Sequence, residues 1–157
     1  MEKIRGFEVV IESVLEKHFG SGQFEVLTPK RGSQHAAGYD FFAQEDTTIE
    51  AGAIALIPVG VKAYMQGDEV LYLYDRSSNP KKKGIVLINS VGVIDSDYYG
   101  NPSNDGLIFA QFKNITDVPV VLKRGDAIMQ GVFMKYLVAD SGNTDAERVG
   151  GIGSTGN

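Results

Sequence analysis

The chain contains no cysteine and no tryptophan, and only two of its 157 residues are histidine. Without cysteine it has no disulfide framework, no thiolate nucleophile and no cysteine-based zinc site, and a reducing compartment is permitted. No apolar run approaches the roughly 20 residues that a membrane-spanning helix needs, and residues 1–10 lack the apolar core of a secretion signal. We therefore expect a cytoplasmic protein with no membrane partner.

The chain also has no excess of basic residues. It contains 15 Lys and Arg residues and 20 Asp and Glu residues, which gives a formal net charge of -5. Proteins that coat nucleic acid need many basic contacts to phosphate, so we expect no nucleic-acid partner. A small anionic ligand needs only local positive charge and stays compatible with this composition. His18 and His35 are far apart in sequence and lack metal-ligand spacing, which favours structural roles for both.

What the chain does have is a series of short segments rich in Val, Ile, Leu and Tyr, separated by Gly, Asp or Pro. These predicted strands are residues 47–50, 54–65, 69–75, 84–89, 107–113, 118–122 and 127–138. Seven or more short strands in a chain of single-domain length indicate an all-β sandwich or barrel. Residues 70–74 are apolar or aromatic at every position, which predicts a strand covered on both faces, by a second layer or by another subunit.

Only residues 12–19 read as a helix, with Val14, Leu15 and His18 on one face and Gly20 ending it. Residues 140–157 are rich in glycine, poor in large apolar side chains and without a strand period. On composition alone this tail is flexible, and it is either a dispensable end or a lid.

Three polar segments are candidates for chemistry, and the first is residues 75–80, which directly follow the apolar strand. Arg76 supplies a planar fork of donors, and Ser77 and Ser78 supply hydroxyl donors. These groups can bind phosphate oxygens, but they are equally compatible with a solvated turn. For the following run of lysines at residues 81–83 we expect a plain surface role.

The second segment, residues 89–100, runs from an apolar stretch into Asp95, Asp97, Tyr98 and Tyr99. A carboxylate held at the edge of an apolar wall can act as a base toward water, and an adjacent tyrosine offers a flat face to a sugar or a base. A hairpin capped by aspartate is the structural alternative. A calcium loop ranks last, because the further oxygen ligands and the flanking helices are missing.

The third segment, residues 148–156, combines Arg148 with glycines that free backbone N–H groups and with the hydroxyls of Ser154 and Thr155. Such a segment can wrap an anion. It is neither a P-loop, because the lysine of that motif is missing, nor a Rossmann turn, because no strand and helix flank it.

Five short strings of the chain, taken together, resemble the motifs of the trimeric dUTPase family. They are residues 37–40, 76–78, 92–100, 125–130 and 150–156. Each string is too short to be specific, but five of them in the family's order, between residues 37 and 156, form a strong signal. The resemblance implies a jelly-roll-like β fold with residues 1–139 as a single β domain. Residues 140–157 would be a flexible arm that closes over the active site of a neighbouring subunit.

The same resemblance implies a dUTP diphosphatase that converts dUTP to dUMP and pyrophosphate with Mg²⁺, as a homotrimer with shared active sites. Asp95 would deprotonate the attacking water, and Arg148 would neutralise charge. Asp40 would help to organise Mg²⁺ through water, because Mg²⁺ is bound mainly by substrate phosphates. The residues expected to bind substrate are Asn89, Gly92, Val93 and Ile94 at the uracil, Tyr98 at the deoxyribose, Arg76, Ser77, Ser78 and Gln130 along the phosphates, and Ile152, Gly153, Ser154 and Thr155 in the closing arm.

Two departures from the family pattern keep other functions open. Ala127 stands where the family often has arginine, and Ile152 where it usually has an aromatic that stacks on uracil. They motivate an alternative, a nucleotide-switched regulatory protein with a protein partner. A dCTP deaminase on the same fold would need a carboxylate beside the base, and no glutamate occurs in residues 92–100 or 150–156.

Overall fold

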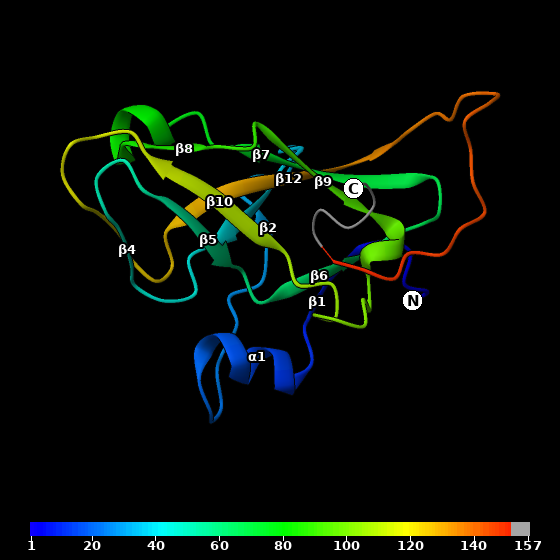
Figure 1. Cartoon of the computed structure of the whole chain (residues 1–157), viewed down its shortest axis with the longest axis horizontal. Helices are drawn as coiled ribbons and strands as arrows, with labels where there is room; N and C mark the ends of the chain where they lie inside the picture. The colour runs from blue at the N-terminus through cyan, green and yellow to red at the C-terminus, as the bar shows by residue number, and fades with distance from the viewer. Residues whose placement is uncertain (152–157) are drawn as a thin grey trace.

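The computed structural model describes residues 1–151, as a β-rich fold with one α-helix, α1 (Glu12–Phe19), which lies outside the sheets (Figure 1) and contacts Phe109 through His18, with 5.6 Å between the ring centres. Two short helical turns are the π-helical η1 (Asn79–Lys83) and the 3-10 turn η2 (Ser96–Tyr98). The strands are β1 (Gly6–Val9), β2 (Lys30–Arg31), β3 (Tyr39–Phe42), β4 (Thr47–Ile49), β5 (Ile54–Pro58), β6 (Val61–Tyr64), β7 (Glu69–Asp75), β8 (Ile85–Leu87), β9 (Val91–Asp95), β10 (Phe109–Asn114), β11 (Val120–Leu122) and β12 (Ala127–Lys135).

The largest sheet has five antiparallel strands in the order β2-β3-β12-β7-β9. Alternate residues of a strand face opposite sides of a sheet, so β7 has two different faces. Its Leu71 and Leu73 point to the core and are at most 3% exposed, whereas Tyr72 and Tyr74 lie on the outer face and are half-buried. Residues 70–74 are therefore apolar on both faces of the strand. One face packs in the core, and the outer face is open in the single chain.

The core lies between this sheet and the smaller sheets β5-β10-β8, β1-β6 and β4-β11. Its members include Phe41, Leu71, Ile85, Phe112 and Ile128, all with no exposed surface. Burial of one such aliphatic or aromatic side chain stabilises the fold by about 1.5–3 kcal/mol. The core therefore fixes the large sheet, from whose edges the polar segments extend.

The predicted helix has the expected bounds, and the predicted strand at residues 69–75 is likewise confirmed. The single strand predicted for residues 54–65 is wrong, because Gly60 takes a left-handed backbone conformation (φ 76°) and divides it into β5 and β6. The strand predicted for residues 127–138 ends at Lys135, where its pairing with β7 ends. The lysines at residues 81–83 belong to η1 and not to a plain turn, with Lys81 and Lys82 exposed as expected.

The N-terminal segment is attached to the β domain by an ion pair and by a hydrogen bond to a buried carboxylate. Arg5 donates through Nε and Nη2 to the two carboxylate oxygens of Glu69, at 2.7 and 2.8 Å. Lys62 Nζ donates to Asp105 Oδ2 at 2.7 Å, and both of these side chains are about nine-tenths buried. The same Asp105 oxygen accepts the backbone N–H of Ile11, just before α1. No helix within residues 1–151 is long and apolar enough to cross a membrane.

Candidate active site

A hollow of about 520 Å³ brings together three of the five strings found in the sequence. We call it the polar pocket. It is lined by Gly32, Ser33, Ala36, Ala37, Gly38, Asp40, Arg76, Ser77, Ser78, Gln130 and Val132. The pairing of β3 with β12 places Asp40 opposite Gln130, and β7 ends beside them at Asp75. A Cβ at Gly38 would lie too close to the present position of the Gln130 side chain, so glycine allows this close approach.

Arg76 is the principal cation of the polar pocket and is fixed on two sides. Its Nε donates to Asp40 Oδ1 at 3.2 Å, and its Nη1 donates to the carbonyl of Ala127, also at 3.2 Å. Gln130 Nε2 donates to the carbonyl of Asp75 at 3.0 Å. The arginine expected at position 127 is absent, and the backbone there instead orients Arg76. A guanidinium held in this way, beside Ser77 and Ser78, can receive an anion with little further ordering.

A second group of side chains forms where β9 ends and η2 begins. Asp95 closes β9, and Arg148 Nη1 donates to Asp95 Oδ2 at 2.9 Å and to Asp97 Oδ1 at 3.4 Å. The arm of the same chain thus returns from β12 toward β9, as the orange-to-red segment of Figure 1 shows. Its prediction as a cover for a neighbouring subunit stays a prediction, because the structure contains one chain.

Tyr98 lies beneath this pair and is 2% exposed. The guanidinium carbon of Arg148 is 5.1 Å from the centre of its ring, within cation–π distance. The Tyr98 hydroxyl donates to the carbonyl of Leu107 at 2.6 Å and accepts from Asn104 Nδ2 at 2.7 Å. Burial raises the pKa of this hydroxyl, so it stays protonated and fixed. One ring face is therefore available to a flat ligand only when Arg148 moves.

The segment expected to contact the base differs from its prediction in one respect. The hairpin considered as an alternative for residues 89–100 is not formed by β8 and β9, because β8 pairs with β10 whereas β9 pairs with β7, so the turn between them connects two sheets. Ser90 takes a positive φ of 64° to make this corner. Ile94 is 7% exposed and belongs to the core, so only its backbone can reach a ligand. Asn89 is exposed at the corner, and Val93 faces outward.

Within one chain, the polar pocket and Asp95 lie at opposite ends of β7. Asp95 pairs with Val70, whereas Arg76 follows the last residue of β7. Six residues of extended strand separate these points, which corresponds to about 20 Å. The structure thus joins residues 37–40, 76–78 and 125–130 in one place, and Asp95, Tyr98 and Arg148 in another. The remaining expected site residues, Ile152, Gly153, Ser154 and Thr155, lie outside the described residues.

Four residues near these groups were given no individual role in the sequence analysis. They are Asp75, Asn79, Asn101 and Asn104. Asn101 is 3% exposed, and its side-chain amide donates to the carbonyl of Gly150 in the arm. Asn104 holds the Tyr98 hydroxyl. The cluster of Asn, Pro, Ser and Asp after Gly100 indicates a turn in the sequence, but nothing in that pattern says that the turn contacts the arm.

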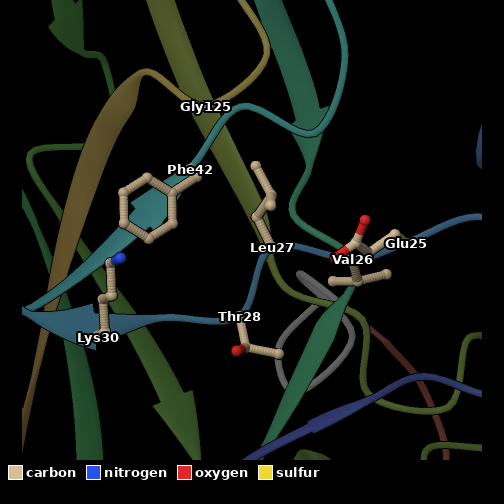
Figure 2. Close-up of a pocket in the computed structure, with 7 residues that line it drawn as sticks. All are labelled: Glu25, Val26, Leu27, Thr28, Lys30, Phe42 and Gly125. Carbon is tan, nitrogen blue, oxygen red and sulfur yellow. The ribbon is translucent and has the colours of Figure 1, made fainter.

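Other hollows lie away from these groups. Figure 2 shows a surface pocket of about 350 Å³ lined by Glu25, Val26, Leu27, Thr28, Lys30, Phe42 and Gly125. It contains none of the residues expected to bind substrate. Among residues 1–151, no three His, Asp or Glu side chains are grouped as a metal site.

The chain belongs to the dUTPase family. The sequence model of that family matches residues 25–156. A Lactococcus lactis subsp. lactis (strain IL1403) protein named deoxyuridine 5'-triphosphate nucleotidohydrolase is 56% identical over 98% of this chain and 99% of its own length. A protein of the same name from Desulfitobacterium hafniense (strain DSM 10664 / DCB-2) is 36% identical over 82% of this chain and 86% of its own length.

Solved structures support the same assignment. The crystal structure of dUTPase from Streptococcus mutans superimposes with a TM-score of 0.77 at 60% identity, covering 87% of this chain and 99% of that one. This confirms the expected jelly-roll-like dUTPase fold. A dUTPase from phage phi11 of S. aureus, described with a structural Mg(II) ion, matches at 18% identity and a TM-score of 0.66, covering 90% of this chain and 97% of that one. At that identity the likeness shows the fold alone.

Proposed function

We propose that this chain hydrolyses dUTP to dUMP and pyrophosphate, with Mg²⁺, as a homotrimer whose active sites are shared between subunits. Membership of the dUTPase family supports the reaction. The observation that carries the shared site is the separation of about 20 Å between Asp95 and Arg76 along β7. A base and the phosphate that its water attacks must be almost in contact, so Asp95 and the polar pocket of one chain cannot serve the same triphosphate.

The outer face of the large sheet supports assembly between these two ends. Cross-strand register aligns Tyr74 with Val91, and Tyr72 with both Val93 and Val132, so apolar rows separate the polar pocket from Asp95. Val91 and Val93 are 40% and 56% exposed in the single chain. An exposed apolar sheet face of this kind is typical of a subunit interface.

Because the pocket end and the Asp95 end are different surfaces, contact between them is heterologous, and such contacts form a ring when the rotation between subunits closes. A ring of three is what the family resemblance implies. In that ring the Asp95 of one subunit would lie at the polar pocket of the next. The arm of a subunit would close the site, with the predicted contacts of Ile152, Gly153, Ser154 and Thr155.

The proposed reaction is an in-line displacement at the α-phosphorus. Asp95 accepts a proton from water as the water oxygen bonds to phosphorus, and the bond from the α-phosphorus to the bridging oxygen breaks to release pyrophosphate. Arg76, with the nearby donors of the polar pocket, holds and neutralises the phosphate oxygens. Tyr98 packs under the deoxyribose and excludes a 2'-hydroxyl. For this packing, Arg148 must move away from the face of the Tyr98 ring, and it then binds the phosphates. Asn89, with the backbone of residues 92–94, reads the uracil edge.

Asp40 would contribute to the Mg²⁺ site through water. One of its oxygens is bound to Arg76, and the other, Oδ2, lies 3.7 Å from the position that a Cβ on Gly32 would take. Glycine therefore leaves room beside this carboxylate, in a pocket that would also contain phosphate oxygens, which Mg²⁺ prefers as ligands. When bound, Mg²⁺ neutralises charge that develops on the phosphates and the leaving pyrophosphate. The cytoplasmic location expected from the sequence stays a prediction.

The test is to incubate the purified protein with Mg²⁺ and dUTP, dCTP, dTTP or UTP in separate reactions, and to measure pyrophosphate, ammonia and nucleotide products. Release of pyrophosphate and dUMP from dUTP alone is expected. Ammonia from dCTP would indicate the deaminase. Tight binding of dUTP without turnover would reject the enzyme and favour the nucleotide-switched regulatory alternative.

A further inference from the structure

Asp75, the last residue of β7, makes contacts with several chain segments of the polar pocket through one carboxylate. Its Oδ1 accepts the backbone N–H of Arg76 at 2.9 Å and Asn79 Nδ2 at 2.6 Å. Its Oδ2 accepts the backbone N–H of Leu87, the last residue of β8, at 2.9 Å. Its backbone carbonyl accepts Gln130 Nε2. The residue therefore fixes the turn that carries Arg76 and connects it to β8 and β12.

Asn79 completes this arrangement from the start of η1 and has no exposed surface. Its Nδ2 lies between Asp75 Oδ1 and the carbonyl of Ile128, at 2.6 and 2.7 Å. Both neighbours are acceptors, so the amide nitrogen must point to them. In this orientation Asn79 Oδ1 has no hydrogen-bond partner among the described residues. The two donors of Asn79 therefore connect the end of β7 to β12.

We infer that Asp75 and Asn79 are a positioning pair for the triphosphate, and we call them the Asp75–Asn79 anchor. The anchor holds Arg76, Ser77 and Ser78 in register with Gln130, because Asn79 binds the carbonyl of Ile128 two residues before Gln130. It touches no substrate itself and acts through the groups that it holds. This inference rests on the proposed function, since it assigns a role in binding the phosphate chain of the proposed substrate.

The geometry also predicts which part of substrate binding depends on the anchor. Within the same chain, Asp95 and Tyr98 lie about 20 Å from the anchor, at the other end of β7, and in the proposed ring the Asp95 and Tyr98 that meet the polar pocket belong to the neighbouring subunit. Asp75 also binds the N–H of Leu87, two residues before Asn89, but Asp75→Asn keeps an oxygen that can accept this bond. Loss of the anchor should therefore weaken binding of the β- and γ-phosphates much more than binding of the nucleoside part. A residue with a merely structural role would weaken both through general loss of the folded trimer.

The test substitution is Asn79→Asp, which keeps the shape of the side chain, removes its donors and introduces a carboxylate between two acceptors. Asn114→Asp is the matched control. Asn114 also has no exposed surface, and its Nδ2 also lies between two backbone carbonyls, those of Ile49 and Val118, at 2.9 and 2.7 Å. No hydrogen bond of Asn114 goes to the polar pocket among the described residues. A second pair covers the case in which Asn79→Asp does not fold. It is Asp75→Asn with Asp46→Asn as its control, because Asp46 likewise accepts a backbone N–H, that of Arg124, at 2.9 Å.

Dissociation constants of each folded trimer are measured calorimetrically for α,β-imido-dUTP with Mg²⁺ and for dUMP. We expect Asn79→Asp and Asp75→Asn to weaken the imido analogue roughly tenfold and dUMP by less than about threefold, with both ligands unchanged in the controls. Equal losses in the control variants, equal losses for the two ligands, or wild-type affinity in the anchor variants would each overturn the inference. The wild-type protein is assayed for dUTP turnover alongside, so that failure of the proposed function is recognised separately.

Discussion

Substitution of Asp95 by asparagine should separate catalysis from substrate binding in this protein. The amide keeps the shape of the side chain at the end of β9 but cannot accept a proton from water. General-base catalysis typically contributes about 10²- to 10⁴-fold to rate, so the turnover number should fall within that range. The substitution also removes the ion pair with Arg148, in which the Asp95 side chain is 50% exposed. An ion pair so exposed contributes up to about 1 kcal/mol, so analogue affinity should change by no more than about fivefold.

The assay is continuous detection of pyrophosphate release from dUTP, paired with calorimetric titration of α,β-imido-dUTP. Asp97→Asn is the matched control, because Asp97 also contacts Arg148, at 3.4 Å, but lies in η2 and is not assigned as the base. The control should retain turnover close to that of the wild-type protein. Turnover in the Asp95→Asn variant at more than a tenth of the wild-type value would refute the assignment of Asp95 as the base.

Three further predictions concern the arm and two ion pairs. Deletion of residues 148–157 should leave the trimer intact by sedimentation but greatly reduce turnover; dissociation into single chains would instead make the arm a structural element. Lys62→Met should lower the free energy of unfolding by about 3 kcal/mol in urea titrations, since it leaves buried Asp105 without its cation; an unchanged midpoint would contradict this. Arg5 lowers the pKa of Glu69, so Arg5→Ala should destabilise the fold at neutral pH. This loss of stability should shrink as pH falls below about 4.5, where the Glu69 carboxyl of the unfolded chain is protonated. A loss of stability that stays constant down to pH 3, measured by thermal unfolding, would refute the linkage.

The order of apolar and polar residues along the chain was sufficient to predict one strand and the α-helix. The strand at residues 69–75 and the helix at residues 12–19 have the expected bounds, because the strand is an unbroken apolar run, the helix has a helical period, and each ends at a break. Strands β3 and β9 were not predicted as strands, since each combines polar or glycine residues with apolar ones. Gly92 has a packing role, because a Cβ there would lie 2.9 Å from Leu73 Cβ. The division of β5 from β6 depends on one left-handed glycine that composition does not distinguish.

The sequence predicted which residues belong to the candidate site, but it did not predict how these residues are arranged in space. The sequence grouped Arg76 with Ser77 and Ser78, and Asp95 with Tyr98, because each group is contiguous. That the two groups lie at opposite ends of β7 follows only from the strand register. The role of Asn79 depends on contacts with Asp75 and Ile128, the latter 49 residues away along the chain, and no local pattern encodes such a contact.

The shared active site is the central claim, and mixed trimers test it directly. An Asp95→Asn chain and an Arg76→Ala chain, each expected to be inactive alone, are co-expressed in equal amounts. If each site takes Asp95 from one subunit and Arg76 from the next, random assembly leaves about one quarter of the sites with both groups intact. The mixture should therefore show about a quarter of wild-type pyrophosphate release. Activity no higher than that of the two parent variants would mean that one chain supplies both groups, and would contradict the account.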